Sequence, residues 1–179
     1  MAHPAQIEYC NLIKSKFPRF FKNTKVIDFG SLDINGNNRI YFEDCEYTGI
    51  DIGAGNNVDI ICMAHEFMAP DNTYDVVIST EMFQNDKFIY LSLPNMIRVL
   101  RPGGLFLFTC AGNGRTETGT MRNSPDHSPL TTTMPGDWPS YYKSIDEELI
   151  RSIIDIDAAF SGISFNIFGS DFRGFGIKK

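Results

Sequence analysis

The chain has 179 residues, of which 42% are hydrophobic and 15 are phenylalanine, and its formal net charge is −6. This composition indicates one globular domain and excludes a disordered chain. The acidic balance excludes a broad nucleic-acid-binding surface, which needs clustered lysine and arginine. The longest apolar stretch is far shorter than the roughly 18 residues that a membrane span needs, and the first ten residues lack the pattern of a secretory signal.

Four cysteines are spread along the chain without a Cys-x-x-Cys pair or a Cys/His cluster: Cys10, Cys45, Cys62 and Cys110. Zinc sites and disulfide frameworks need such clusters, so no metal site is predicted. Isolated cysteines in apolar runs are typically small, reduced core residues. We therefore expect a protein of the reducing cytoplasm.

The first part of the chain predicts a helix and then four strands. Helical spacing over residues 5–21 places Tyr9, Leu12, Ile13 and Phe17 on one face, and Pro18 is expected to end this N-terminal helix, which lies within residues 1–22. Four mainly apolar runs follow, at residues 25–30, 46–52, 57–62 and 73–80. Continuous apolar runs, rather than alternation, indicate parallel strands that are covered on both faces of a sheet.

The second part of the chain begins with a helix predicted over residues 88–100, which Pro102 and the following glycine pair terminate. A strand is predicted over residues 105–111. Residues 112–142 are rich in glycine, threonine, serine, asparagine and proline. A segment of this length without its own elements is usually functional or disordered in a compact domain.

The C-terminal residues predict one more helix and a hairpin. Helical spacing returns over residues 144–157, where Ser144 is the expected N-cap and Glu147 completes a capping box. The strands at residues 163–169 and 171–179 are so close that only a hairpin can join them. Residues 1–179 therefore form one doubly wound α/β domain, with a mostly parallel sheet and an antiparallel C-terminal strand.

Three of the predicted parallel strands end in polar residues. The first ends at Asp28 to Gly30, the second at Asp51, and the fourth at Thr80 and Glu81. In doubly wound sheets ligands bind at the carboxyl ends of the strands, where the strand order reverses. These residues are therefore expected to face one crevice.

Four stretches in this order resemble the motifs of class I S-adenosylmethionine-dependent methyltransferases: "VIDFGSLDING" from residue 26, "YTGIDI" from residue 47, "YDVVISTEMFQN" from residue 74 and "RVLRPGGLFLFT" from residue 98. The resemblance runs from about Lys25 to the C-terminus. It implies a Rossmann-like sheet of seven strands with an antiparallel last strand, and S-adenosylmethionine as the cofactor. In this chain Met63 stands where many members carry an acid that binds the adenine amino group.

The resemblance assigns cofactor contacts residue by residue. Asp51 would accept hydrogen bonds from both ribose hydroxyls, although an aspartate there could instead cap a helix. Asp28 would hold the ammonium group of the cofactor, or it is a solvated acid at a strand end. Gly30 would let the backbone approach closely. The other predicted cofactor contacts are Ser31, Ile52, Ala64, His65, Thr80 and Met82.

The methyl acceptor is expected to be a small molecule or a saccharide, methylated on a hydroxyl or carboxyl group by in-line transfer. Glu81, His127 and His65 are the candidate general bases, although Glu81 could cap the next helix and His127 could be a solvated loop residue. Residues 112–142 would form the acceptor side of the site. The Asn/Asp-Pro-Pro-aromatic motif of nitrogen methyltransferases is missing after the fourth strand, so a nucleic-acid acceptor is not expected, nor is a membrane partner.

Two alternatives remain open at the level of sequence. A non-catalytic subunit could bind S-adenosylmethionine without transferring its methyl group, which the altered first and third motifs would suit. A nicotinamide-dependent oxidoreductase could use a similar sheet. That second class needs a Gly-x-Gly-x-x-Gly turn after the first strand, which "GSLDING" does not supply.

Overall fold

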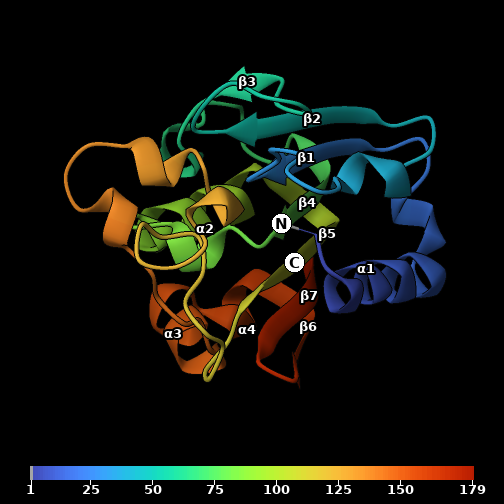
Figure 1. Cartoon of the computed structure of the whole chain (residues 1–179). Helices are drawn as coiled ribbons and strands as arrows, with labels where there is room; N and C mark the ends of the chain where they lie inside the picture. The colour runs from blue at the N-terminus through green and yellow to red at the C-terminus, as the bar shows by residue number, and fades with distance from the viewer. Residues whose placement is uncertain (1) are drawn as a thin grey trace.

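The computed structural model describes residues 2–179 of the chain. Its centre is a seven-stranded sheet with the strand order β3-β2-β1-β4-β5-β7-β6 (Figure 1). Strands β1 to β5 pair in parallel, and β7 pairs antiparallel with both β5 and β6. The strands are β1 Lys25–Phe29, β2 Glu46–Asp51, β3 Ile60–Ile61, β4 Tyr74–Thr80, β5 Leu100–Ala111, β6 Phe160–Phe168 and β7 Asp171–Lys178. The predicted fold class is confirmed.

The middle of the sheet is covered on both faces, as the apolar runs predict. Along β4, Val77 packs into one hydrophobic cluster, while its neighbours Val76 and Ile78 pack into the other, and all three are fully buried. Helix α1 (Pro4–Lys16) lies on one side of the sheet. Helices α2 (Ile89–Val99), α3 (Glu147–Ile153) and α4 (Ile156–Ala159) lie on the other side (Figure 1).

Helix α1 ends before Pro18, as predicted, and buries Tyr9 and Ile13 of the predicted face but not Leu12. The chain leaves the α-helix at Lys16 and forms a short 3-10 turn at Pro18–Phe20, because proline disfavours helical geometry in the residue before it. Leu12 is 44% exposed, whereas Gln6 is buried. The buried amide of Gln6 donates a hydrogen bond to Asn38 and so joins the helix to the loop after β1.

The predicted helix over residues 144–157 is two helices, and its expected cap is wrong. Asp146, not Ser144, is the N-cap of α3, and its side chain accepts a hydrogen bond of 2.9 Å from the Leu149 N–H. Asp155 caps α4 in the same way, through the Ala158 N–H at 3.0 Å. A carboxylate favours a helix N-terminus more strongly than a hydroxyl does, since it also interacts with the helix dipole.

Strand β3 is shorter than predicted, and several connections between the strands contain only short 3-10 turns. Strand β3 covers only Ile60–Ile61 of the predicted residues 57–62. The connection from β1 to β2 contains a 3-10 turn at Asn38–Tyr41 instead of an α-helix. Residues 112–142 contain three further 3-10 turns, at Pro125–His127, Thr131–Thr133 and Trp138–Ser140. No helix within residues 2–179 combines the length and apolar character of a membrane-spanning segment.

Candidate active site

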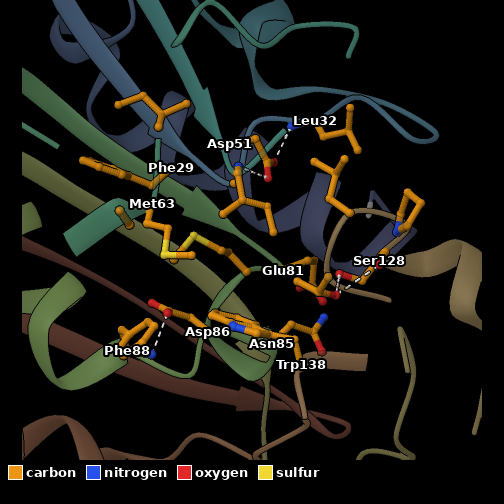
Figure 2. A pocket seen from close by; sticks show the side chains of 18 of the residues that line it. Phe29, Leu32, Asp51, Met63, Glu81, Asn85, Asp86, Phe88, Ser128 and Trp138 are labelled. Carbon is orange, nitrogen blue, oxygen red and sulfur yellow. Dashed lines mark hydrogen bonds between the residues drawn. The ribbon is translucent and has the colours of Figure 1, made fainter. Parts of the chain in front are cut away.

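One pocket lies at the carboxyl ends of β1, β2 and β4, beneath residues 127–138 (Figure 2). The space between its lining residues, the open mouth included, is about 760 Å³. Five of the predicted cofactor contacts line it together with Asp51 and Gly30: Ile52, Ala64, His65, Thr80 and Met82. The structure thus brings together side chains from three strand ends and from the long loop.

Asp51 is fixed in the wall of this pocket by the backbone around it. One of its oxygens accepts a hydrogen bond from the Leu32 N–H at 2.9 Å, and the other accepts one from the Ile52 N–H at 2.8 Å. Burial raises the pKa of the Asp51 carboxyl, although these two hydrogen bonds oppose the effect. Each oxygen keeps a lone pair for a ligand. The element that directly follows β2 is strand β3 and not a helix, so the alternative role of Asp51 as a helix cap is wrong.

Asp28 does not line the main pocket, and it is not solvated. It is fully buried and borders a smaller pocket behind Gly30. The Asn38 amide donates to both of its oxygens at 3.1 and 3.2 Å, and the Tyr47 hydroxyl donates at 2.5 Å. Burial raises the pKa of Asp28 to about 6, despite these donors. Its contact with the cofactor ammonium stays a prediction, but the alternative of a solvated strand-end acid is wrong.

Gly30 occupies a position that no other residue fits easily. Its φ of +81° lies in the left-handed region, and a Cβ there would lie 2.7 Å from the Met82 Cβ. The next residue, Ser31, is buried and borders the smaller pocket instead of the main one. Its hydroxyl donates to the Asn57 carbonyl at 3.1 Å. The Ser31 side chain therefore holds the loop after β2 in place, and its predicted contact with the cofactor remains untested.

Glu81 lines the pocket, but other groups of the protein already occupy its carboxylate. The Arg115 guanidinium lies 2.6 Å from one oxygen, and the Thr109 hydroxyl donates to the other at 3.0 Å. Burial acts to raise the pKa of Glu81, but the neighbouring His3 and Arg115 outweigh it and lower the pKa to about 2. So acidic a carboxylate is a poor proton acceptor. The role of Glu81 as a base stays a prediction, which this pairing disfavours, while the alternative of a helix cap is wrong, since α2 begins at Ile89.

His127 does reach the pocket, as part of the long loop. This loop lies closely over the strand ends, because a Cβ on Gly53 would meet the Leu130 side chain at 2.7 Å. An ion pair between Lys87 and Asp137 ties the loop to the segment after β4. The predicted alternative of a solvated His127 is not what the structure shows, since the residue is half-buried against the pocket.

Three lining residues in the segment after β4 are missed by the sequence reasoning: Asn85, Asp86 and Phe88. Asn85 Oδ1 and Asp86 Oδ2 are buried and have no hydrogen-bond partner among the described residues. Phe88 packs against Trp138 of the long loop, with ring centroids 5.8 Å apart. The sequence contained a signal for Asn85 and Asp86, because these two polar residues stand between the large apolar residues Phe83 and Phe88.

Comparisons with known proteins show what this chain is similar to. The family model described as a methyltransferase domain matches residues 33–108, somewhat less than half of the chain. The fold is similar to that of a SAM-dependent methyltransferase from Aquifex aeolicus, at 15% identity and a TM-score of 0.62, over 99% of this chain and 94% of that one. Residues 33–108 are thus similar to a methyltransferase domain, and the chain has the fold of the class I methyltransferases. The resemblance seen in the sequence is confirmed.

Two larger proteins share the fold of this methyltransferase domain. One is phosphoethanolamine N-methyltransferase 2 of Haemonchus contortus, in complex with phosphomonomethylethanolamine and S-adenosylhomocysteine, at 16% identity and a TM-score of 0.64 over 99% of this chain and 54% of that one. The other is the carbon methyltransferase CurJ, at 13% identity and a TM-score of 0.65 over 97% of this chain and 54% of that one. The chain spans about half the length of each. Sequence comparison found no match to a curated protein.

Proposed function

We propose that this domain binds S-adenosylmethionine and transfers its methyl group in line to a hydroxyl or carboxyl group of a small polar molecule, such as a saccharide. The observation that carries the proposal is Asp51, whose two oxygens are held in the pocket wall by backbone N–H groups. A carboxylate fixed in this way suits a pair of adjacent ribose hydroxyls, because charged acceptors make the stronger hydrogen bonds.

The lining of the pocket fits a positively charged cofactor. S-adenosylmethionine supplies a methyl group on a cationic sulfur, so the protein need not activate it further. The charged residues that are described as lining the pocket are acids, namely Asp51, Glu81 and Asp86, and no lysine or arginine is among them. Behind Gly30, the buried Asp28 adds a fourth acid that would attract the ammonium group of the cofactor.

The acceptor side of the pocket favours a neutral hydroxyl over a carboxylate. A carboxylate would meet the acidic lining without a cation to pair with, since Arg115 is held by Glu81 and Asp171 at 2.6 and 3.0 Å. The ring of Trp138 gives this side an apolar surface, and Asn85 offers an unpaired amide oxygen. Such a combination of flat apolar surface and few polar groups suits a ring-shaped polar acceptor.

His127 is the proposed base that takes the proton of an acceptor hydroxyl. It lies on the pocket in the loop that covers the strand ends, whereas the Glu81 carboxylate is held by Arg115 and Thr109. Most of the rate acceleration would come from alignment of the two reacting groups, which supplies roughly 7–11 kcal/mol in well-oriented systems. Closure of the loop over the strand ends would also exclude water.

Two measurements test this function. Titration with S-adenosylhomocysteine is followed by calorimetry and by the fluorescence of Trp138, the one tryptophan in the sequence, and binding is expected to change that fluorescence. Incubation with S-adenosylmethionine and a saccharide panel is then expected to release S-adenosylhomocysteine. His127→Gln should slow release without weakening binding, while Asp126→Asn in the same turn should leave both unchanged. A protein that binds NAD and not S-adenosylhomocysteine would rule out the proposal.

A second candidate function is that of a subunit that binds the cofactor without catalysis. The structure favours it at one point, because the Ser31 side chain holds the loop after β2 and does not face the main pocket. In that case S-adenosylhomocysteine binds, yet no acceptor in the panel is methylated. Turnover with any acceptor excludes this candidate.

A further inference from the structure

The pocket contains buried polar atoms that the protein itself leaves unpaired. Asp86 is 9% exposed, and one of its oxygens accepts a hydrogen bond from the Phe88 N–H at 2.8 Å. Its other oxygen, Oδ2, has no hydrogen-bond partner among the described residues, although the equally unpaired Ser92 hydroxyl lies near this carboxylate, and Nδ1 of His65 has no partner there either. A buried polar atom without a partner is unfavourable. These two atoms therefore call for a ligand that offers them hydrogen-bonding groups.

Asp86 and His65 lie at the end of the pocket where β3 stops. The ring of His65 lies 4.4 Å from that of Phe88, two residues beyond Asp86. The Asn95 amide of α2 donates to the carbonyls of Ala64 and Phe67 at 2.8 and 3.1 Å, which holds the turn after β3 against this helix. Figure 2 shows the Asp86 carboxylate at the Phe88 and Met63 end of the pocket, away from Ser128.

The base of the cofactor belongs at the same end. If Asp51 binds the ribose, as the proposed function requires, the base extends toward the lining residues that follow β2 and β3, which are Ile52, Met63 and Ala64. The thioether of Met63 is a weak hydrogen-bond acceptor and cannot satisfy an amino group well. Of the acids that line the pocket, Asp86, from the segment after β4, is the one that Figure 2 shows at the Met63 end.

We propose that Asp86 recognises the adenine of S-adenosylmethionine by accepting a hydrogen bond from its 6-amino group, with His65 Nδ1 beside it to pair with the purine edge. This inference rests on the proposed function and names a specificity residue for the same pocket. The adenine edge presents an amino donor next to a ring-nitrogen acceptor. A carboxylate beside an imidazole N–H matches that order, whereas a 6-oxo base would face the carboxylate with another acceptor.

Asp86 also has a structural contact that the test must preserve. Its Oδ1 accepts a hydrogen bond from the Phe88 N–H just before α2. The Ser92 hydroxyl of α2 also lies near the carboxylate. Burial raises the pKa of Asp86, and the Ser92 hydroxyl and the Phe88 N–H oppose this rise. Asp86→Asn keeps the shape and the oxygen that accepts from Phe88. It replaces the other oxygen with an N–H donor, which repels the amino group of adenine and suits the carbonyl of hypoxanthine.

The test compares S-adenosylhomocysteine with S-inosylhomocysteine, its 6-oxo analogue, in binding calorimetry. The wild-type protein is expected to bind the adenine compound at least tenfold more tightly. Asp86→Asn should reduce that ratio tenfold or more. Asp146→Asn is the matched control, since Asp146 also accepts a backbone N–H but caps α3 outside the pocket. Its ratio should equal that of the wild type.

The outcomes separate this inference from the proposed function. An unchanged ratio in Asp86→Asn overturns the inference alone, provided that the wild type binds S-adenosylhomocysteine. Equal binding of the two compounds by the wild type also overturns it, and this comparison needs no variant to fold. If the wild type binds neither compound, both the proposed function and the inference fail.

Discussion

The guanidinium of Arg115 lies 2.6 Å from the carboxylate of Glu81, a residue whose backbone φ of +61° lies in the left-handed region. Side chains other than glycine adopt this region at a cost of about 1–3 kcal/mol, and they persist there only when their surroundings fix them. Arg115 comes from the long loop and also contacts Asp171 of β7 at 3.0 Å. The ion pair therefore joins the end of β4, the loop and the C-terminal hairpin in one place.

Arg115→Ala is expected to lower the free energy of unfolding by roughly 3–5 kcal/mol, because it leaves the buried Glu81 carboxylate unpaired. Arg122→Ala is the control, since its ion pair with Glu117 is exposed and such pairs contribute about 1 kcal/mol or less. Urea unfolding of both variants makes the comparison. Equal losses in the two variants would show that the Glu81 pair does not stabilise the fold.

The low pKa of Glu81 predicts a loss of stability in acid. The group has a folded pKa of about 2 and an ordinary value of 4.5, so the unfolded chain binds its proton first as the pH falls. The stabilising contribution is present above pH 4.5 and is lost as the pH falls toward 2. Unfolding free energies measured across this range should fall more steeply for the wild type than for Glu81→Gln. Parallel curves would contradict the assignment.

Asp28 predicts the opposite pH dependence. Its folded pKa is about 6 against an ordinary value of 3.8, so the folded protein holds a proton that the unfolded chain has released. Stability from this group is fully present below pH 3.8 and is lost as the pH rises to about 6. The carboxyl signal of Asp28, followed by NMR, should titrate near pH 6. Titration at or below its ordinary value would contradict the prediction.

Gly30→Ala should impair both folding and cofactor binding. The variant must hold a positive φ, and its Cβ must also displace Met82, which lies 2.7 Å from the ideal Cβ position. Gly114→Ala separates the two effects, because Gly114 has a similar φ of +85° and no atom within 4 Å of the added Cβ. The control should lose about 1–2 kcal/mol from backbone strain alone. Thermal unfolding and calorimetry with S-adenosylhomocysteine should show a larger loss for Gly30→Ala.

Asp51→Ala should weaken the binding of S-adenosylhomocysteine by about 1–3 kcal/mol, the cost of leaving buried polar groups without a partner. Asp146→Ala removes another carboxylate that accepts a backbone N–H, outside the pocket. That control should lose stability but keep its affinity. Calorimetry measures the affinity of the two variants for S-adenosylhomocysteine. An unchanged affinity in Asp51→Ala would show that this residue does not bind the ribose.

Sequence periodicity predicted the sheet well because strands depend on local runs of residues. The buried run at Val76 to Ile78 could form only a covered strand, and it does. Residues near strand ends were also found, since Asp51 and Gly30 follow apolar runs directly. Element boundaries were less certain. That α3 begins at Asp146 and not at the predicted Ser144 is decided by backbone geometry that no short pattern records.

The order of apolar runs and turn residues thus determined by itself the doubly wound sheet, the acid at Asp51 and the glycine at residue 30. Only the tertiary structure decided that Glu81 pairs with Arg115, 34 residues away, and that Asn85 and Asp86 line the pocket with unpaired atoms. The physical reason is that burial and charge pairing arise between segments distant in sequence. The type of a residue shows which groups it can bind, but its neighbours in the folded structure decide whether its charge and its hydrogen-bonding atoms are already paired.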